Sequence, residues 1–131
     1  MKKLKCYYAH TMLSYGSTIE AQDIKTLEEL GFEVVNPNTE EIKAGMEEYV
    51  FNYGKADVMN YFDIIVKTCD LIAFRSLPNG DILSGVASEI NSAIFHNIPV
   101  IELPCSLEAR MLLYPETKQF LIEVGHYKLN K

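Results

Sequence analysis

One acidic residue, Glu89, stands where a carboxylate could act as a nucleophile. It belongs to the segment SGVASE at 84–89, on the opening turn of an expected helix. An apolar run at 71–74 and a turn-rich loop precede this helix, and a second apolar run follows it at 98–103. The order strand, loop, helix, strand is typical of open α/β sheets, where ligands bind at the carboxyl ends of strands. A carboxylate placed there repels a phosphate but can attack a sugar carbon.

The residues around Glu89 are small, and the loop before it is rich in turn formers. Small side chains let a ligand approach the backbone closely, so we expect part of this segment to contact substrate. The predicted substrate-binding residues here are Asp81, Ser84 and Gly85.

Two further acids and two tyrosines are candidates for the same site. Asp63 interrupts an apolar helical stretch, where it is either a site residue or a solvent-facing position one turn from Lys67. Asp70 lies at a helix–strand junction, where a turn or cap role competes with substrate binding. Tyr7 and Tyr8 alternate along the first strand, so one faces each side of the sheet and one should point into the cleft.

The loop that follows the first strand, at 10–17, is a weaker candidate for binding substrate. Ser14, Gly16 and Ser17 precede a helix N-terminus, which can bind an anion such as a 5′-phosphate. The loop matches neither a Walker sequence nor G-x-G-x-x-G. His10 has no second histidine or carboxylate close by in the sequence, so we predict no metal site there. His96 closes the Glu89 helix and is interpreted as structural.

Strands and helices alternate along the chain, which predicts a mostly parallel sheet covered on both faces. We expect one domain over 1–131, a flavodoxin/Rossmann-like three-layer α/β sandwich with four or five strands. Strands are expected at 3–9, 32–35, 70–75 and 98–103. Helices are expected at 18–30, 39–44, 46–53, 56–67, 85–96 and 107–125, the last broken at Pro115. The apolar face of the first helix should comprise Ile19, Ile24, Leu27 and Leu30.

Composition limits the classes of partner. The formal net charge of −6 over 131 residues argues against a nucleic acid polymer, which requires clustered Lys and Arg. No apolar run approaches 18 residues, so neither a membrane span nor a signal peptide is expected. The three cysteines, Cys6, Cys69 and Cys105, show no metal-ligand spacing. Reduced structural thiols in a cytoplasmic protein are the simplest interpretation.

Three segments together resemble the nucleoside 2-deoxyribosyltransferase superfamily, which includes deoxynucleoside 5′-monophosphate N-glycosidases. The first is the aromatic strand Tyr7-Tyr8-Ala9-His10. The second is 63–72, in which one Asp is followed seven residues later by another that opens a strand. The third is 84–89, similar to the family's G-x-G-x-E, whose Glu is the nucleophile. The resemblance spans residues 3–104.

The resemblance implies a role for each matched residue. Glu89 would attack C1′ of the sugar and expel the base, as in a retaining glycosidase. Asp63 would contact the base or hold the leaving group, and Tyr7 or Tyr8 would hydrogen-bond Glu89. The loop at 10–17, with Ser84 and Gly85, would surround the 5′ end of a nucleoside or nucleotide. No metal, redox group or other cofactor is implied.

The chain departs from the family pattern at three positions. Ala87 stands at the family's second motif Gly, Asn91 at a later Gly, and Leu83 at a position that is Asp in transferases and Ser in N-glycosidases. These departures weaken a transferase more than a hydrolase. Leu83 and Ala87 also favour an alternative, a silent module that binds or sequesters a nucleotide.

Two further hypotheses remain from the sequence. A TIR-like NAD glycohydrolase would also use one Glu on a flavodoxin-like sheet. Tyrosine-rich apolar segments such as 49–53 and 61–62 exceed what one small core requires, which predicts a homodimer or higher homo-oligomer.

Overall fold

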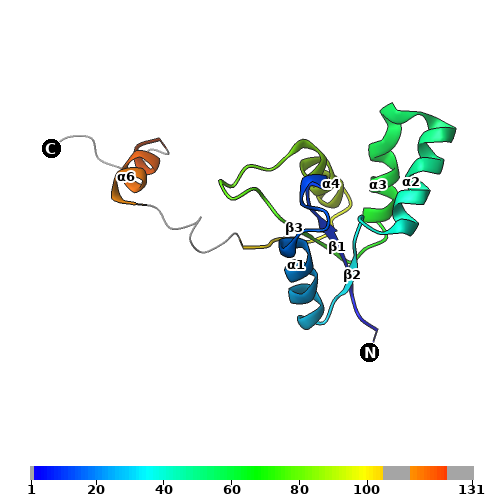
Figure 1. Cartoon of the computed structure of the whole chain (residues 1–131), viewed down its shortest axis with the longest axis horizontal. Coiled ribbons are helices and arrows are strands. Elements are labelled where there is room, and N and C mark those ends of the chain that lie inside the picture. Colours follow the sequence, from blue (N-terminus) through cyan, green and yellow to red (C-terminus); the bar gives the residue numbers. More distant parts are fainter. Residues whose placement is uncertain (1, 105–112, 124–131) are drawn as a thin grey trace.

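A computed structural model describes residues 2–104 and 113–123 and shows an α/β protein built on a parallel sheet (Figure 1). Its strands are β1 (Lys5–Ala9), β2 (Glu33–Val35), β3 (Leu71–Phe74) and β4 (Val100–Glu102). They pair in parallel in the order β2-β1-β3-β4. This order is that of flavodoxin-like doubly wound sheets. The expected Rossmann-like three-layer class is therefore confirmed.

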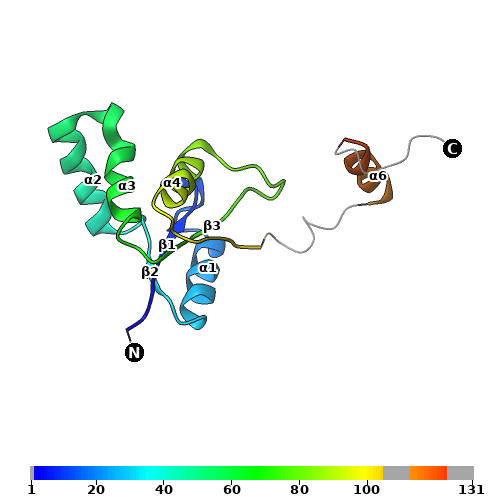
Figure 2. The same cartoon turned by 180° about the vertical axis from the view of Figure 1, so that it is seen from behind.

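Helices cover both faces of the sheet (Figures 1 and 2). The helix α1 (Thr18–Glu29) packs on one face, and α3 (Val58–Val66) and α4 (Ser84–Phe95) pack on the other. The helix α2 (Glu40–Tyr53) packs against α3 and has no buried residue. Short 3₁₀ helices, η1 (Met12–Ser14) and η2 (Lys55–Asp57), precede α1 and α3, and α6 (Tyr114–Glu123) lies nearest the C-terminus. Within the described residues, no helix has the length and apolar content needed to cross a bilayer.

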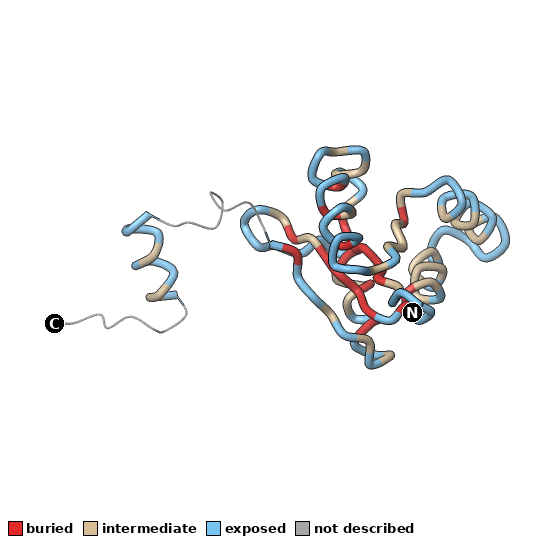
Figure 3. Tube along the Cα trace, turned by 90° about the horizontal axis from the view of Figure 1, so that it is seen from below, coloured by how far each residue is buried: buried red, intermediate tan, exposed pale blue. Residues whose placement is uncertain are grey.

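The core consists of two apolar clusters separated by the sheet, visible as the buried central strands in Figure 3. Alternate side chains of a strand face opposite sides, so Tyr7 joins the α3–α4 cluster and Tyr8 joins the α1 cluster. Both tyrosines are 0% exposed. The predicted alternation of this pair is confirmed.

Local signals account for both ends of α1 and of α2. Ser17 caps α1 by accepting a hydrogen bond from the Glu20 N–H, and Thr39 caps α2 in the same way through Ile42. Gly31 and Gly54, with φ of +97° and +92°, follow the ends of α1 and α2, because a positive φ is accessible to glycine without strain.

Several expected details differ from the structure. Residues 40–53 form one continuous helix rather than two. Ile19 on α1 and Leu30 at its C-cap are 48% and 64% exposed, while Glu20 and Asp23 of α1 are buried. Pro115 lies in the first turn of α6, where its missing N–H breaks no helical bond.

Part of the last expected helix, at 107–112 and 124–125, and Cys105 lie outside the described residues. The other two cysteines, Cys6 and Cys69, are buried free thiols.

Candidate functional site

The strand order creates a crevice at the carboxyl ends of β1 and β3. From β1 the chain crosses to β2 through α1 on one face, whereas from β3 it crosses to β4 through α4 on the other. The two connections diverge there, and such a switch point is where open α/β sheets bind ligands. Glu89 lies beside this switch point as the sixth residue of α4, one turn later than the sequence suggested.

Glu89 is 8% exposed and accepts a hydrogen bond from the hydroxyl of Tyr7. Burial disfavours the charged carboxylate and raises its pKa from 4.5 to about 7, although the Tyr7 hydrogen bond lowers it. Burial, followed by the charge of Glu89, raises the pKa of Tyr7 well above its usual range, so the phenol is a hydrogen donor. A buried carboxyl group that titrates near neutral pH is typical of catalytic sites.

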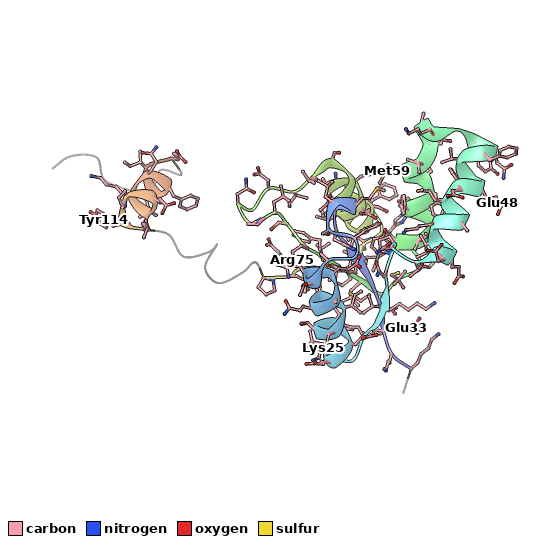
Figure 4. All side chains as sticks on the ribbon, viewed as in Figure 1. Lys25, Glu33, Glu48, Met59, Arg75 and Tyr114 are labelled. Atoms are coloured by element: carbon pink, nitrogen blue, oxygen red, sulfur yellow. The ribbon has the colours of Figure 1, made fainter. Side chains whose placement is uncertain are left out.

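A cavity of about 270 Å³ opens between α3 and α4 on the Glu89 side of the sheet. Six of its seven lining residues have polar side chains, with two amides, two carboxyls and two hydroxyls. Met59, labelled in Figure 4, contributes the apolar wall from α3. The lining residues are Met59, Asn60, Asp63, Ser88, Glu89, Asn91 and Ser92. The cavity therefore brings Asp63 and Glu89, which are 26 positions apart in the sequence, to one site.

Asp63 forms the second carboxyl group of this cavity. Its Oδ1 accepts hydrogen bonds from the Ser92 hydroxyl and from Nε2 of His96, the latter at 3.3 Å. The Ser92 hydrogen bond is the main reason why the pKa of Asp63 is lowered; burial opposes it, and His96 and Lys67 support it. Asp63 is therefore an ionised acceptor at neutral pH.

The loop after β1 is held by a buried pair, His10 and Glu20. His10 Nε2 lies 2.7 Å from Glu20 Oε2, and Nδ1 lies 3.1 Å from the Tyr8 carbonyl oxygen. The other Glu20 oxygen accepts from the Gly16 N–H at 3.0 Å. Asn38 donates to both oxygens of this carboxylate. Glu20 therefore already binds the Gly16 N–H and the His10 ring, which the sequence predicted would contact the 5′ end of the substrate.

The remaining loop residues also bond within the protein. Ser14 Oγ donates to the Thr11 carbonyl at 2.8 Å, and Ser17 Oγ caps α1. Contacts of Ser14, Gly16, Ser17 and His10 with substrate stay predictions. The structure shows these residues shaping the loop that borders the crevice.

Tyr15, from the same loop, was missed as a site residue. Burial, then the charges of Glu89 and Glu20, raises the pKa of Tyr15 to about 12. Its ring lies 4.9 Å from that of His10, and Lys43 Nζ lies 5.8 Å from its centre. Tyr15 thus packs against His10 within the loop and lies within electrostatic range of the Glu89 carboxyl. A tyrosine in a glycine- and serine-rich loop before a helix was the available signal.

Tyr8 serves a separate network on the opposite face. Its hydroxyl donates to Asp23 Oδ2 at 2.6 Å, and the Arg75 guanidinium binds both Asp23 oxygens. Arg75, labelled in Figure 4 beside α1, also donates to the Pro104 carbonyl. Of the two tyrosines that could hold Glu89, only Tyr7 does so.

Four other predicted binding residues do not line the 270 Å³ cavity. Asp70 sits at the amino end of β3, where Oδ2 accepts from the Lys5 N–H at 2.7 Å. This is the edge of the sheet opposite the crevice, so the structure does not bring Asp70 to the site. Asp81 is exposed and bonds to Asn79 in the β3–α4 loop. Ser84 and Gly85 are exposed in the first turn of α4, one turn before Glu89.

Sequence reasoning also missed two groups of polar residues. Ser92 and His96 recur three and seven positions after Glu89, a spacing that places all three on one helix face. Glu20 and Asp23 recur at helical spacing with Leu27, which marks the buried face of α1. Among the described residues, no group of three or more His, Cys, Asp and Glu could hold a metal ion.

Comparison with known proteins found no family model that matches this chain and no curated protein that matches it significantly.

Proposed function

We propose that this protein cleaves the N-glycosidic bond of a (deoxy)nucleoside or its 5′-monophosphate, as a member of the nucleoside 2-deoxyribosyltransferase superfamily. The observation that carries the proposal is Glu89, a buried carboxyl group bonded to Tyr7 at the switch point of the sheet. It shares a cavity of about 270 Å³ with Asp63. A carboxylate nucleophile and a second carboxylate are the groups that glycoside cleavage uses.

In the proposed reaction, an ionised Glu89 oxygen forms a bond to C1′ as the bond from C1′ to the base nitrogen breaks. The electron pair of that bond leaves with the base, which takes a proton from solvent. Water then attacks C1′ of the glycosyl ester, loses a proton, and releases the free sugar and the Glu89 carboxylate. Attack by a second base instead of water would make the reaction a transfer.

Tyr7 supports this chemistry by holding one of the two oxygens. Its hydroxyl donates to Oε2 of Glu89, and in the proposed reaction Oε1 is the oxygen that attacks the sugar carbon. The same hydrogen bond stabilises the ionised form and opposes the effect of burial on the pKa. Base release should therefore increase with pH as Glu89 ionises near pH 7.

A binding module is the second candidate, and the start of α4 favours it. Leu83 is the N-cap of this helix and offers no side-chain hydrogen bond. A polar group at this position would be expected in the transferases and N-glycosidases that the sequence resembles. The protein would then retain a nucleotide in the cavity without breaking it.

The test is a chromatographic screen of wild type and Glu89→Gln against nucleosides, 5′-monophosphates and NAD, each with and without a free base. Glu48→Gln, an exposed change on α2, serves as the matched control. Base released by wild type and Glu48→Gln but not by Glu89→Gln supports the proposal. A nucleotide bound without turnover by any of the three supports the binding module, and nicotinamide release supports an NAD glycohydrolase.

We further propose that the protein is a cytoplasmic homo-oligomer. Phe51 and Tyr53 on α2 are 89% and 66% exposed, and covering such side chains is a common role of subunit contacts. Light scattering after size exclusion should give at least the mass of a dimer, and a monomer at micromolar concentration would refute this.

A further inference from the structure

The Asp63 carboxylate joins α3 to α4 through one of its two oxygens. Oδ1 accepts from the Ser92 hydroxyl and lies 3.3 Å from His96 Nε2. No described residue donates a hydrogen bond to Oδ2. The side chain is 38% exposed, and Asp63 lines the same cavity as Glu89. One oxygen is thus fixed by the protein and the other is open to a ligand.

The two donors come from the helix that carries the proposed nucleophile. Glu89, Ser92 and His96 follow one another at intervals of three and four positions, so they form a row along one face of α4. Asp63 faces this row from α3. The row therefore fixes where the free Asp63 oxygen lies relative to Glu89.

The hydrogens in this cluster can be assigned from its chemistry. An ionised carboxylate has only acceptors, so the Ser92 hydroxyl and His96 Nε2 must both donate to it. Two donors to one oxygen stabilise the ionised form, which agrees with the lowered pKa of Asp63. An ionised Asp63 cannot supply a proton to a leaving base. It can accept a hydrogen bond from that base.

We propose that Ser92 and His96 are positioning residues that hold Asp63 as an acceptor for the amino group of a nucleobase. The inference rests on the proposed function and specifies its substrate class, bases with an exocyclic amino group at the edge that meets α3. An analogue that lacks this group leaves the carboxylate oxygen without its partner. Sites built around such a hydrogen bond discriminate strongly against the analogue without it.

The neighbours of the cavity are compatible with this assignment. The amides of Asn60 and Asn91 also line it and can donate and accept along the rest of a base edge. Ser88 lines the cavity from α4 as well, but it forms no hydrogen bond with Asp63. Ser88→Ala is therefore a matched control for Ser92→Ala, because each removes one hydroxyl from the same helix.

The test measures equilibrium binding by calorimetry in a Glu89→Gln background, where turnover cannot interfere. The probes are two pairs of 5′-monophosphates, each in ribo and deoxy forms. Adenosine 5′-monophosphate is compared with purine riboside 5′-monophosphate, and cytidine 5′-monophosphate is compared with 2-pyrimidinone riboside 5′-monophosphate. We expect at least one pair to show a preference for the amino form of about tenfold or more. Ser92→Ala and His96→Ala should each reduce this preference to about threefold or less, whereas Ser88→Ala, Ser92→Thr and His96→Gln should preserve it.

Each alternative outcome overturns the inference. Equal affinity for the amino and non-amino forms would show that Asp63 does not bind the amino group. Absence of binding by all probes would also refute the inference. A fall in affinity that is equal for both members of a pair in Ser92→Ala would assign Ser92 a purely structural role. Circular dichroism of each variant identifies those that fail to fold, and for these the threonine or glutamine variant gives the answer.

The proposed function is judged separately, by base release from the wild-type chain. Base release without an amino preference would overturn only this inference. An amino preference without base release would overturn the glycosidase function and leave the assignment of Asp63 intact.

Discussion

Replacing Glu89 by glutamine should make the protein more stable at alkaline pH, because the native carboxylate is costly to bury. The pKa of Glu89 is about 7 in the folded protein, against 4.5 ordinarily. Below pH 4.5 the group is protonated in both the folded and the unfolded chain, and its ionisation has no effect on stability. Between pH 4.5 and 7 only the unfolded chain ionises, so stability falls as pH rises. Above pH 7 the full cost is present.

The magnitude follows from the difference between these pKa values. The cost is about 3 kcal/mol at pH 8 and below about 1 kcal/mol at pH 5. Glutamine carries no charge and keeps an oxygen that can accept from the Tyr7 hydroxyl. The Glu89→Gln protein should therefore be more stable than wild type by up to about 3 kcal/mol at pH 8, a large share of the stability of an ordinary domain.

Urea unfolding at pH 5 and pH 8 measures this difference. The chain has no tryptophan, so the far-ultraviolet circular dichroism of its helices is the suitable signal. Glu48→Gln, on the exposed side of α2, should show no comparable change between the two pH values. A Glu89→Gln protein that is less stable than wild type at pH 8, or equally shifted at both pH values, would refute the reasoning.

Three further predictions concern other parts of the structure. Tyr7→Phe removes the hydrogen bond that lowers the pKa of Glu89, so the rise of base release with pH should move above pH 7; an unchanged profile would contradict the pairing. Leu27→Ala should lower the free energy of unfolding, measured in urea, by about 2–5 kcal/mol, as for other buried leucines, because Leu27 is 0% exposed. Leu30 is 64% exposed, so Leu30→Ala should change this free energy by about 0.5 kcal/mol or less. Burial raises the pKa of Glu20, but its hydrogen bonds outweigh this and lower it, so Glu20→Gln should destabilise most above pH 4.5 and progressively less in acid; a loss independent of pH would refute a stabilising role for the ionised carboxylate.

The fold class followed from local patterns in the sequence. Apolar strands alternate with amphipathic helices, and residues such as Ser17 and Gly31 mark helix ends through their own hydrogen bonds and backbone freedom. These signals involve only a few neighbouring residues, so the helix ends can be predicted from the sequence without the tertiary structure. The position of Glu89, between an apolar run and a helix, also indicated which edge of the sheet would carry a site.

The sequence was a poorer guide to which polar side chains are buried. On α1 the sequence suggested Ile19 and Leu30 for the core, yet Glu20 and Asp23 are buried and these two apolar residues are exposed. The acids are tolerated because His10 hydrogen-bonds to Glu20 and Arg75 forms an ion pair with Asp23. His10 and Arg75 each lie more than one helical turn away in the sequence from the acid that they contact, so neither pair could be recognised from local spacing. Hydrophobic periodicity, in addition, predicts only apolar side chains at buried positions.

What the sequence determined, then, was the set of elements, the parallel sheet and the edge at which Glu89 stands. Only the tertiary structure decided that Tyr7 rather than Tyr8 bonds to Glu89, across 82 positions, and that Asp63 bonds to Ser92 across 29. Strand order, register and helix packing set these contacts, because each depends on how elements far apart in the chain are brought together. A pattern of neighbouring residues contains no information about such distances, and the chemistry of the site depends on them.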